Sequence, residues 1–600
     1  MEDGVAARSQ RGRRGPRYEG EDLSPTTSLE LRGFYAYGLA AEVFAVCGIG
    51  SFVPVTLEQL AREGGVLWSD KTTPCVAKTA GKGAAALAAR LLTRAASPDN
   101  NQCVVRVFGA ELTTSSFAMY TFSLAVFTQA LALVSFSSIA DHATYRKKLL
   151  VAFGFTGAIS SMLFLFIVPQ IFVLGSLLTI IGVTCLGSSF VILNSYIPLL
   201  VANHPETQGD DDHEMNGVVS FPMEPLSPGL RRRESSDRED LYTPVHSSGL
   251  QKADSPALKL STKISAKGVG IGYMAAVSVQ IFSILILFLM SKMKVSSTLA
   301  LRLVLFFVGI WWFAFTIPAA KWLKDRPGPP LRTGISGGRL RSCLAYTSFA
   351  WVSLWKTVKV AAKLRQAVIF LIAWFLLSDA IATVSGTAIL FARTELRMGT
   401  VPIAILSITA TASGIAGASI WPILSRRFGW KTNHTLVACL CFMEIVPLYG
   451  LLGYLPFFQS LGWGGLQQAW EIYPLGFVHG FVMGGISSYA RSFFGRLIPP
   501  GMEAAFYALF AITDKGSSAV GPAIVGVIVD ATGTIRPAFF FLAVLIALPA
   551  PLIWMVDVEK GQADAVRLAG IMKKRSVDDE SGESGNEGLQ EAEGLMRDHD

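Results

Sequence analysis

The chain has 600 residues and a net charge of +8, and only 16% of its residues are charged. Soluble globular proteins carry about 25% charged residues, whereas the mean hydropathy of this chain is +0.45. The composition therefore excludes an ordinary soluble protein and indicates a membrane protein. The sequence also lacks the basic-aromatic pattern of nucleic-acid-binding proteins, so nucleic acid is not an expected partner.

Apolar runs of about 20 residues, the length that crosses a bilayer as a helix, recur along the chain. They predict an all-α polytopic membrane protein with about twelve transmembrane helices. The first run is far longer than the core of a signal peptide, so we expect no cleavable signal. The expected helices are 34–57, 115–138, 149–168, 171–197, 269–290, 300–323, 367–391, 402–424, 435–456, 471–490, 502–529 and 536–556.

Basic residues predict the orientation, because cytosolic loops of membrane proteins are enriched in Lys and Arg. They gather before the first helix and in the turns after the second and eighth helices. These three places lie on one side of the membrane, so both termini are expected in the cytosol. The long loop 61–111 then lies on the opposite side, where Cys75 and Cys103 could form a disulfide or remain thiols.

Polar segments divide the chain into two six-helix halves. A stretch near Tyr346–Leu364 combines tryptophans with lysines, and it either lies on the membrane surface or extends the seventh helix into water. The expected segments are a disordered basic tail (1–32), helices one to four (33–202), a disordered cytosolic loop (203–266), helices five and six (267–325), a central cytosolic linker (326–366), helices seven to twelve (367–557) and a disordered tail (558–600).

Two six-helix halves joined by a central loop are typical of the major facilitator architecture, in which the halves rock about a central site. The turns after the second and eighth helices resemble the cytosolic loop motif of that superfamily, although several of its usual residues are missing. Ordinary positive-inside turns are the alternative interpretation. The candidate cytosolic gate residues are Asp141, Arg146, Lys147, Arg426, Arg427 and Arg491.

Several expected membrane helices contain ionisable residues. A charged side chain at the bilayer centre costs roughly 2.5–3.5 kcal/mol on insertion scales, so such groups usually face a protein interior or a water-filled path. Glu42 lies in the first helix, Asp379 in the seventh, Glu444 in the ninth, and Asp514 and Lys515 are adjacent in the eleventh. We expect a structural hydrogen bond for Glu444, because the ninth helix of this architecture usually packs at the periphery.

Asp379 and Lys515 both lie near the middle of their expected helices, which places them at similar depths at about 1.5 Å of rise per residue. We predict that they form a pair or share a polar network, with two separately solvated groups as the alternative. Asp514 and Lys515 are sequence neighbours, so we expect their side chains to diverge and not to need each other.

Glu42 shares one face of the first helix with Tyr35 and Gly38, because the three residues follow helical spacing. This face could bind the ammonium group of a substrate or carry a proton, or Glu42 could form an interhelical hydrogen bond. Gly38 permits close approach of a helix or a ligand. Two further candidates for the pathway are Asn194 and His479, for which helix ends and packing hydrogen bonds are the alternatives.

Residues 31–44 resemble the opening motif of the autophagy-related protein 22 family. Bacterial relatives often have Asp where this chain has Gly38, and Glu42 is the candidate to replace it. The resemblance implies a fungal vacuolar membrane transporter of the major facilitator superfamily, which releases leucine and other neutral amino acids after autophagic breakdown. Further segments that are similar to the family are 54–62, 193–203, 265–273, 489–492, 499–507 and 514–518.

The resemblance, together with the helix pattern, implies a monomeric amino-acid transporter of the vacuole membrane that works by alternating access, with or without proton coupling. No phosphate-binding loop, zinc spacing or nucleophile elbow is found in the sequence, so we expect no enzymatic activity, cofactor or metal. A non-transporting receptor or scaffold that acts through its cytosolic loops is the main alternative, and a lipid-handling protein is a third.

Overall fold

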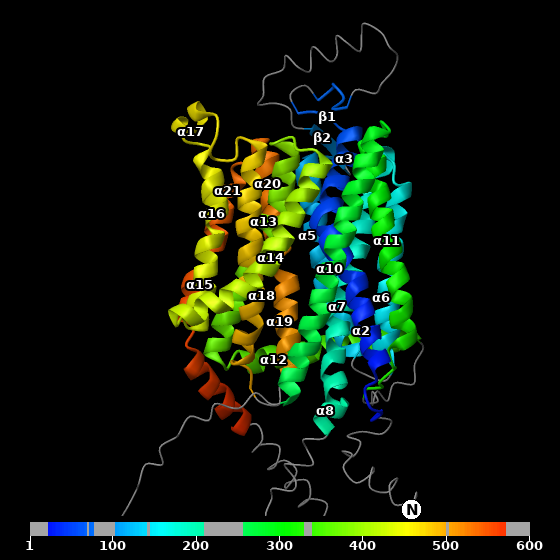
Figure 1. Ribbon diagram of the computed structural model, residues 1–600, viewed down its shortest axis with the longest axis vertical. Coiled ribbons are helices and arrows are strands. Elements are labelled where there is room, and N and C mark those ends of the chain that lie inside the picture. The colour runs from blue at the N-terminus through cyan, green and yellow to red at the C-terminus, as the bar shows by residue number, and fades with distance from the viewer. Residues whose placement is uncertain are drawn as a thin grey trace, which may run out of the picture.

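The computed structural model describes residues 22–68, 71–76, 103–107, 109–140, 144–208, 256–328, 339–499 and 503–571. In this part of the chain most residues are helical, and a small β-sheet lies at one end of the helical bundle (Figure 1). We call this the sheet end. The opposite end is called the α12 end, after the helix α12 (Arg339–Ala361) that lies there.

The first half of the bundle precedes α12 and also contains the sheet. Its elements are α2 (Ser28–Val43), η1 (Phe44–Phe52), α3 (Val53–Gly64), β1 (Val66–Leu67), β2 (Cys103–Val107), β3 (Ala110–Thr113), α5 (Thr114–Ala140), α6 (Tyr145–Leu163), η3 (Phe164–Phe166), η4 (Pro169–Ile171), α7 (Phe172–Ala202), α8 (Pro205–Gln208), α10 (Pro256–Lys292) and α11 (Ser297–Trp322).

The second half follows α12, and a further helix over residues 558–571 comes after it. Its elements are α13 (Arg365–Thr394), α14 (Thr400–Phe428), α15 (Thr432–Met443), α16 (Ile445–Leu452), α17 (Pro456–Leu461), η5 (Ala469–Glu471), α18 (Ile472–Gly495), α19 (Glu503–Ser517), α20 (Val520–Thr532), α21 (Ala538–Ala547) and α22 (Pro549–Met555).

Ten helical stretches of the described chain are long and apolar enough to cross a membrane. They coincide with the expected first to ninth and twelfth helices. The expected ranges 471–490 and 502–529 are also helical, as α18 and as α19 followed by α20, but these are not among the ten. The eleventh expected helix is therefore discontinuous.

The two halves meet along a few pairs of helices. From the first half, α5 packs against α19 and α20, and α10 packs against α14. At the α12 end, α12 packs against both α5 and α19, so it contacts both halves. Within the second half, α14 and α18 approach closely, and the absence of a side chain at Gly480 permits this. A Cβ atom there would collide with the Ala410 carbonyl.

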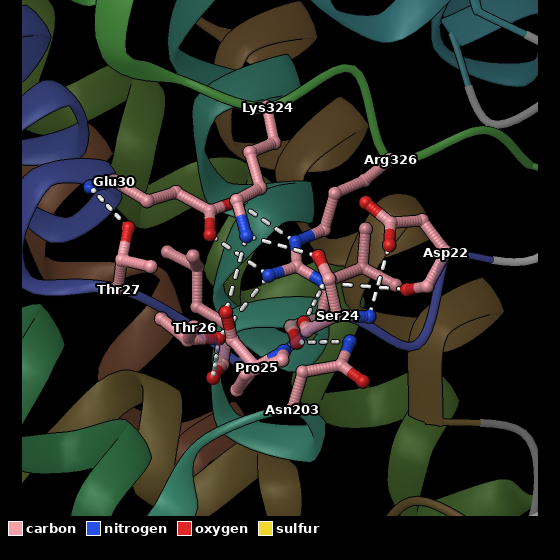
Figure 2. Close-up of polar contacts among 11 residues, drawn as sticks. Asp22, Ser24, Pro25, Thr26, Thr27, Glu30, Asn203, Lys324 and Arg326 are labelled. Atoms are coloured by element: carbon pink, nitrogen blue, oxygen red, sulfur yellow. Dashed lines mark hydrogen bonds and ion pairs between the residues drawn. The ribbon is translucent and has the colours of Figure 1, made fainter.

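The N-terminal segment is ordered from residue 22 onward, contrary to the disordered tail expected over 1–32. Arg326 holds it in place: its guanidinium donates to both carboxylate oxygens of Glu30 at 2.8 Å and to the carbonyls of Asp22 and Ser24 (Figure 2). Thr26 bonds to two carbonyls at the end of α7. The order thus depends on groups distant in sequence, which local composition does not reveal.

Two other segments expected to be disordered also begin or end in helix. α10 begins at Pro256, inside the expected loop 203–266, because Leu260 and Ile264 on its first turns are buried. The expected tail 558–600 starts as a helix over 558–571. The Asp557 carboxylate accepts hydrogen bonds from the backbone N–H groups of Glu559 and Lys560 at its start. A side-chain acceptor at this position stabilises a helix start.

The loop expected over 61–111 contains the three antiparallel strands in the order β1-β2-β3. A disulfide joins Cys75 to Cys103, with their Cα atoms 6.1 Å apart. Of the two states considered for these cysteines, the structure therefore has the disulfide. β3 ends at Thr113 and the chain continues directly into α5, so the sheet is attached to a helix at the boundary of the two halves.

The amphipathic stretch near Tyr346–Leu364 forms a helix of its own. α12 ends at Ala361, and the turn that follows, closed by a hydrogen bond from the Leu364 N–H to the Ala361 carbonyl, separates it from α13. The alternative that this stretch extends the seventh helix is therefore excluded.

Candidate functional site

Glu42 lies where the first membrane helix changes its winding. α2 ends at Val43, and the next nine residues, Phe44–Phe52, form a π-helix before α3 begins. π-helical turns are rare and occur frequently at functional sites. Sequence reasoning missed this element, although Gly48, Gly50 and Pro54 inside one apolar run are the signal that could have indicated an irregular helix.

The backbone of α10 lies directly against Glu42. A Cβ atom at Gly272 of α10 would be 2.9 Å from the Cβ of Glu42, and a Cβ at Gly38 would be 3.8 Å from the Gly268 carbonyl. Glycines four residues apart on α10 thus allow α2 to approach closely, as in other membrane helix pairs. Gly38 therefore lies at the contact between α2 and α10.

A charge of opposite sign from the second half acts on Glu42. Lys515 of α19 interacts electrostatically with the Glu42 carboxylate, and its ammonium group lies 2.9 Å from Asp514 Oδ2. The expectation that Asp514 and Lys515 diverge was wrong, because their side chains turn toward each other. Asp514 Oδ1 also accepts a hydrogen bond of 2.9 Å from the Ser378 hydroxyl of α13.

Asp379 does not share this arrangement. Its side chain is buried, and Oδ1 accepts a hydrogen bond of 2.9 Å from the Gly521 N–H, at the start of α20. The first backbone N–H groups of a helix lack partners within it and carry a partial positive charge, so Asp379 stabilises the start of α20. The structure places Asp379 and Lys515 in separate interactions instead of the predicted pair.

The remaining candidates of the expected pathway lie apart from this group. Tyr35 is partly exposed, with the Lys267 ammonium group 5.4 Å from its ring centroid. Asn194 is exposed on α7. His479 of α18 lies 3.0 Å from the Ser385 hydroxyl of α13, within the second half, which agrees with the packing role considered for it. Glu444 lies between α15 and α16.

A polar contact that sequence reasoning missed crosses between the halves inside the bundle. Ser51 of η1 donates to the Ser407 hydroxyl of α14 at 2.6 Å and accepts from the Gln280 amide of α10 at 3.1 Å. Ser51 and Gln280 are fully buried. Serine and glutamine in apolar runs are common, so only the three-dimensional arrangement identifies these residues as a junction.

The basic residues of the expected cytosolic gate bond within their own half or extend outward. The Arg146 guanidinium lies 5.7 Å from the Tyr196 ring centroid, and Lys147 lies 3.9 Å from Asp325. Arg426 and Arg427 are exposed, and Arg426 donates to a carbonyl of its own helix. Two members lie outside the residues or side chains that the structure describes, Asp141 and Arg491.

An ion pair joins the halves at the sheet end. Arg393 of α13 lies 3.7 Å from Glu58 of α3, and it also donates to the Gln59 side chain. Glu58 is fully buried and accepts a hydrogen bond of 3.3 Å from the Thr114 hydroxyl at the start of α5. Removing one partner of a buried ion pair strongly destabilises the protein, because the other charge then stays buried without a partner.

Asp530 of α20 makes a second connection at the sheet end. It accepts hydrogen bonds from the Thr113 N–H at 2.9 Å, from the Tyr120 hydroxyl at 3.0 Å and from the Ser116 hydroxyl. An acid of the second half thus stabilises the start of α5 in the first half. We call Glu58, Gln59, Arg393 and Asp530 the sheet-end latch. Sequence reasoning missed it, because its members lie outside the apolar centres of the helices.

The group around Glu42 contains charges of both signs. Glu42 and Lys515 come from different halves, and Asp514 adds a second carboxylate beside Lys515. Among the residues that the structure describes, no group of three or more His, Cys, Asp or Glu side chains could hold a metal ion.

Comparison with known proteins gives one consistent result. The family described as vacuole effluxer Atg22-like matches residues 26–566. Autophagy-related protein 22 of Botryotinia fuckeliana is 67% identical, over 100% of both chains. Autophagy-related protein 22-1 of Sclerotinia sclerotiorum is likewise 67% identical over 100% of both chains, and autophagy-related protein 22-2 of Neosartorya fischeri is 57% identical over 97% of both.

Among solved structures, an auto-inhibited POT family peptide transporter aligns with 88% of this chain and 96% of its own, at a TM-score of 0.50 and 12% identity. At this identity the likeness concerns the fold alone. It agrees with an all-α polytopic bundle of the major facilitator type, made of two halves.

Proposed function

Because the chain belongs to the vacuole effluxer Atg22-like family, we propose that it releases neutral amino acids, including leucine and other apolar ones, from the vacuole into the cytosol by alternating access. The chain is a multi-pass transporter of the vacuolar membrane, with a fold of the major facilitator type. The proposal concerns the substrate, the residues that bind it and the movement that releases it.

The observation that carries the proposal is the set of charges formed by Glu42, Lys515 and Asp514. A neutral amino acid is a zwitterion, with an ammonium and a carboxylate group on adjacent atoms. Lys515 offers a cation for the carboxylate, and Glu42 offers an anion for the ammonium group. Since these residues belong to different halves, a bound substrate would connect both halves, as alternating access requires.

The sheet-end latch supports the direction of the movement. We place the sheet end in the vacuole lumen and the α12 end in the cytosol, because the Cys75–Cys103 disulfide at the sheet end suits an oxidising compartment. The latch then holds the lumenal side closed. This is the state from which a substrate leaves to the cytosol, and breaking the latch would admit substrate from the lumen.

The test is counterflow of labelled leucine in proteoliposomes that contain the purified full-length chain. We expect uptake by the wild type and its loss in Glu42→Gln and in Lys515→Gln, because each variant removes one of the two opposed charges. Glu444→Gln is the matched control: it neutralises an acid in a membrane helix outside this group, and we expect it to keep wild-type counterflow.

Absence of amino-acid counterflow in the folded wild type would overturn the proposal and favour the receptor or scaffold alternative. Equal loss in Glu42→Gln and Glu444→Gln would show that any buried acid is needed for folding, and would remove Glu42 from the binding site. Repeating the assay with and without a pH gradient tests coupling: a proton-coupled wild type accumulates more leucine with the gradient, whereas an uncoupled one gives equal uptake in both.

A further inference from the structure

Helix α12 has two distinct faces. Ala350, Thr357 and Ala361 are buried and Leu354 is partly buried, and these four residues share the side of the helix that packs on α5 and α19. α5 belongs to the first half of the bundle and α19 to the second. The inner face of α12 therefore spans the boundary between the halves at the α12 end (Figure 1).

The opposite face exposes large apolar side chains. Trp351 is 42% exposed, Val352 is 52% exposed and Trp355 is 60% exposed. Apolar surface exposed to water is unfavourable, because it does not gain the free energy that burial would provide. Two tryptophans one helical turn apart are typical of a segment that lies at a membrane–water interface, where the ring is buried and its N–H stays hydrated.

Lysines lie beside these tryptophans on the same face. Lys356 and Lys359 are exposed, and the Lys359 ammonium group lies 5.8 Å from the centroid of the Trp355 ring. The sequence from 339 to 365 has no acidic residue, and its basic residues are Arg339, Arg341, Lys356, Lys359, Lys363 and Arg365. An apolar edge next to a wholly basic edge fits an anionic surface with an apolar layer beneath it.

The position of α12 agrees with such a surface. α13, an apolar helix long enough to cross a membrane, starts at Arg365, four residues after α12 ends. α12 therefore lies at the level where the membrane-spanning segments leave the bilayer. A helix at this level with exposed tryptophans contacts headgroups and the first part of the acyl chains.

We propose that the exposed face of α12 binds anionic lipid headgroups of the cytosolic leaflet. Trp351 and Trp355 enter the boundary between headgroups and acyl chains, and Lys356, Lys359 and Lys363 contact lipid phosphates. The leaflet assignment rests on the orientation proposed above. Because the inner face of α12 contacts both halves, the lipid holds in place an element that spans them at this end.

A second occupant with negative charge is the chain's own C-terminal region. Residues 578–600 are rich in Asp and Glu but contain no aromatic residue and few apolar ones. Such a segment matches the lysines but leaves the two tryptophans uncovered. A lipid surface satisfies both edges of α12, so the observations favour lipid, and the acidic segment becomes an outcome of the test.

The test uses the full-length chain in nanodiscs and does not depend on transport, so its failure is distinct from failure of the proposed function. A photoreactive residue is introduced by Val352→p-benzoylphenylalanine, and crosslinked species are identified by mass spectrometry. The nanodiscs contain phosphatidylcholine with a minor fraction of phosphatidylserine. We expect phospholipid adducts in which phosphatidylserine is enriched about fivefold or more over its bulk fraction, given the attraction per basic residue near a membrane.

The variant Lys356→Gln/Lys359→Gln/Lys363→Gln should bring the enrichment back to the bulk fraction. Trp351→Ala/Trp355→Ala should lower the total yield of phospholipid adducts. Lys292→Gln/Lys294→Gln is the matched control, since these lysines are exposed at the opposite end of the bundle, and it should match the wild type. All variants are compared at equal thermal stability, which separates lipid binding from unfolding.

Two results would overturn the proposal. One is a wild-type adduct population in which phosphatidylserine has its bulk fraction, which would mean that the lysines select no lipid. The other is crosslinking to a peptide from residues 572–600 in place of phospholipid, which would assign the exposed face to the chain's own C-terminal region.

Discussion

Arg393 of the second half lies 3.7 Å from the fully buried Glu58 of the first half, so an ion pair connects the halves at the sheet end. Asp530 adds hydrogen bonds from the same end of the second half to the start of α5. In the alternating-access movement proposed above, these contacts must break before the sheet end opens, so they should control how often it opens.

Removing the latch should therefore shift the chain toward a state open at the sheet end. Met119 reports this: it is buried and lies beside Gly386 of the other half. In a Met119→Cys background, Arg393→Ala or Asp530→Asn should speed labelling by a membrane-impermeant thiol reagent by about tenfold, as expected when an interaction worth about 1.4 kcal/mol is lost.

Arg302→Ala is the control for this experiment. Arg302 also donates to a backbone carbonyl, at Ile167, but both residues belong to the first half. Its loss should leave the labelling rate of Met119→Cys unchanged. Equal labelling in all three variants would mean that the latch does not limit opening.

The ion pair between Arg326 and Glu30 makes a prediction about stability. Both side chains are almost completely buried, and both hydrogen bonds are 2.8 Å long. Breaking a buried pair on one side typically costs about 3–5 kcal/mol. Arg326→Met or Glu30→Met alone should lower the thermal midpoint of the purified protein strongly, whereas the double variant should recover much of the loss. A double variant as unstable as the sum of the two would contradict this account.

Gly521 is expected to tolerate no side chain. A Cβ atom there would collide with the Thr383 hydroxyl and would lie 3.0 Å from the Asp379 carboxylate. Gly521→Ala should destabilise the protein by about 1–3 kcal/mol, the usual cost of overpacking, and should also weaken the hydrogen bond that starts α20. Gly516→Ala is the control, because its added Cβ would make an ordinary contact of 3.5 Å with Ala130. A thermal unfolding series measures both, and equal midpoints would contradict the prediction.

The pKa of Glu111 in β3 indicates how the stability of the sheet should respond to acid. Hydrogen bonds from Lys71 and Arg106, together with their charges, lower the pKa of Glu111 from its usual value of 4.5. A group with a lowered pKa in the folded state contributes stability above its unfolded pKa, and loses it as the pH falls through the folded pKa. This contribution should therefore be constant from about pH 7 to about pH 5, and decline only below about pH 4.

Protease resistance of the sheet end, measured across this pH range, tests the prediction. Glu111→Gln should remove the decline below about pH 4, because the variant has no group to titrate there. A wild-type transition centred near pH 6 that disappears in Glu111→Gln would mean that the ion pairs raise the pKa of this carboxyl, opposite to the expected direction.

The apolar runs predicted where helices lie but not where they end. The first run was expected to stop near Leu57, since Glu58, Gln59 and Arg62 follow it. The structure continues the helix to Gly64 because Arg393 and Thr114 satisfy these polar side chains. A charged residue ends an apolar run in the sequence. In the folded protein the free-energy cost of burying that charge depends on its partners, which the local sequence pattern does not reveal.

The same limit explains which site residues could be predicted. Glu42 and Lys515 were identifiable because an ionisable group in an apolar run is costly. Their relationship was not, since helical spacing fixes faces within one helix and does not state which helices face each other. Asp379 was assigned to Lys515 by depth alone, whereas the interruption between α19 and α20 offered it a closer partner in the Gly521 N–H.

With the sheet end in the vacuole lumen, as proposed above, the Cys75–Cys103 disulfide bears on how proteolysis affects the protein there. It joins the two residues that flank 76–102, and Cys103 is the first residue of β2, which precedes β3 and α5. A protease that cuts the chain anywhere between these cysteines leaves its two parts covalently joined. Such a cut would therefore not release the first membrane helix, and with it Glu42, from the rest of the transporter.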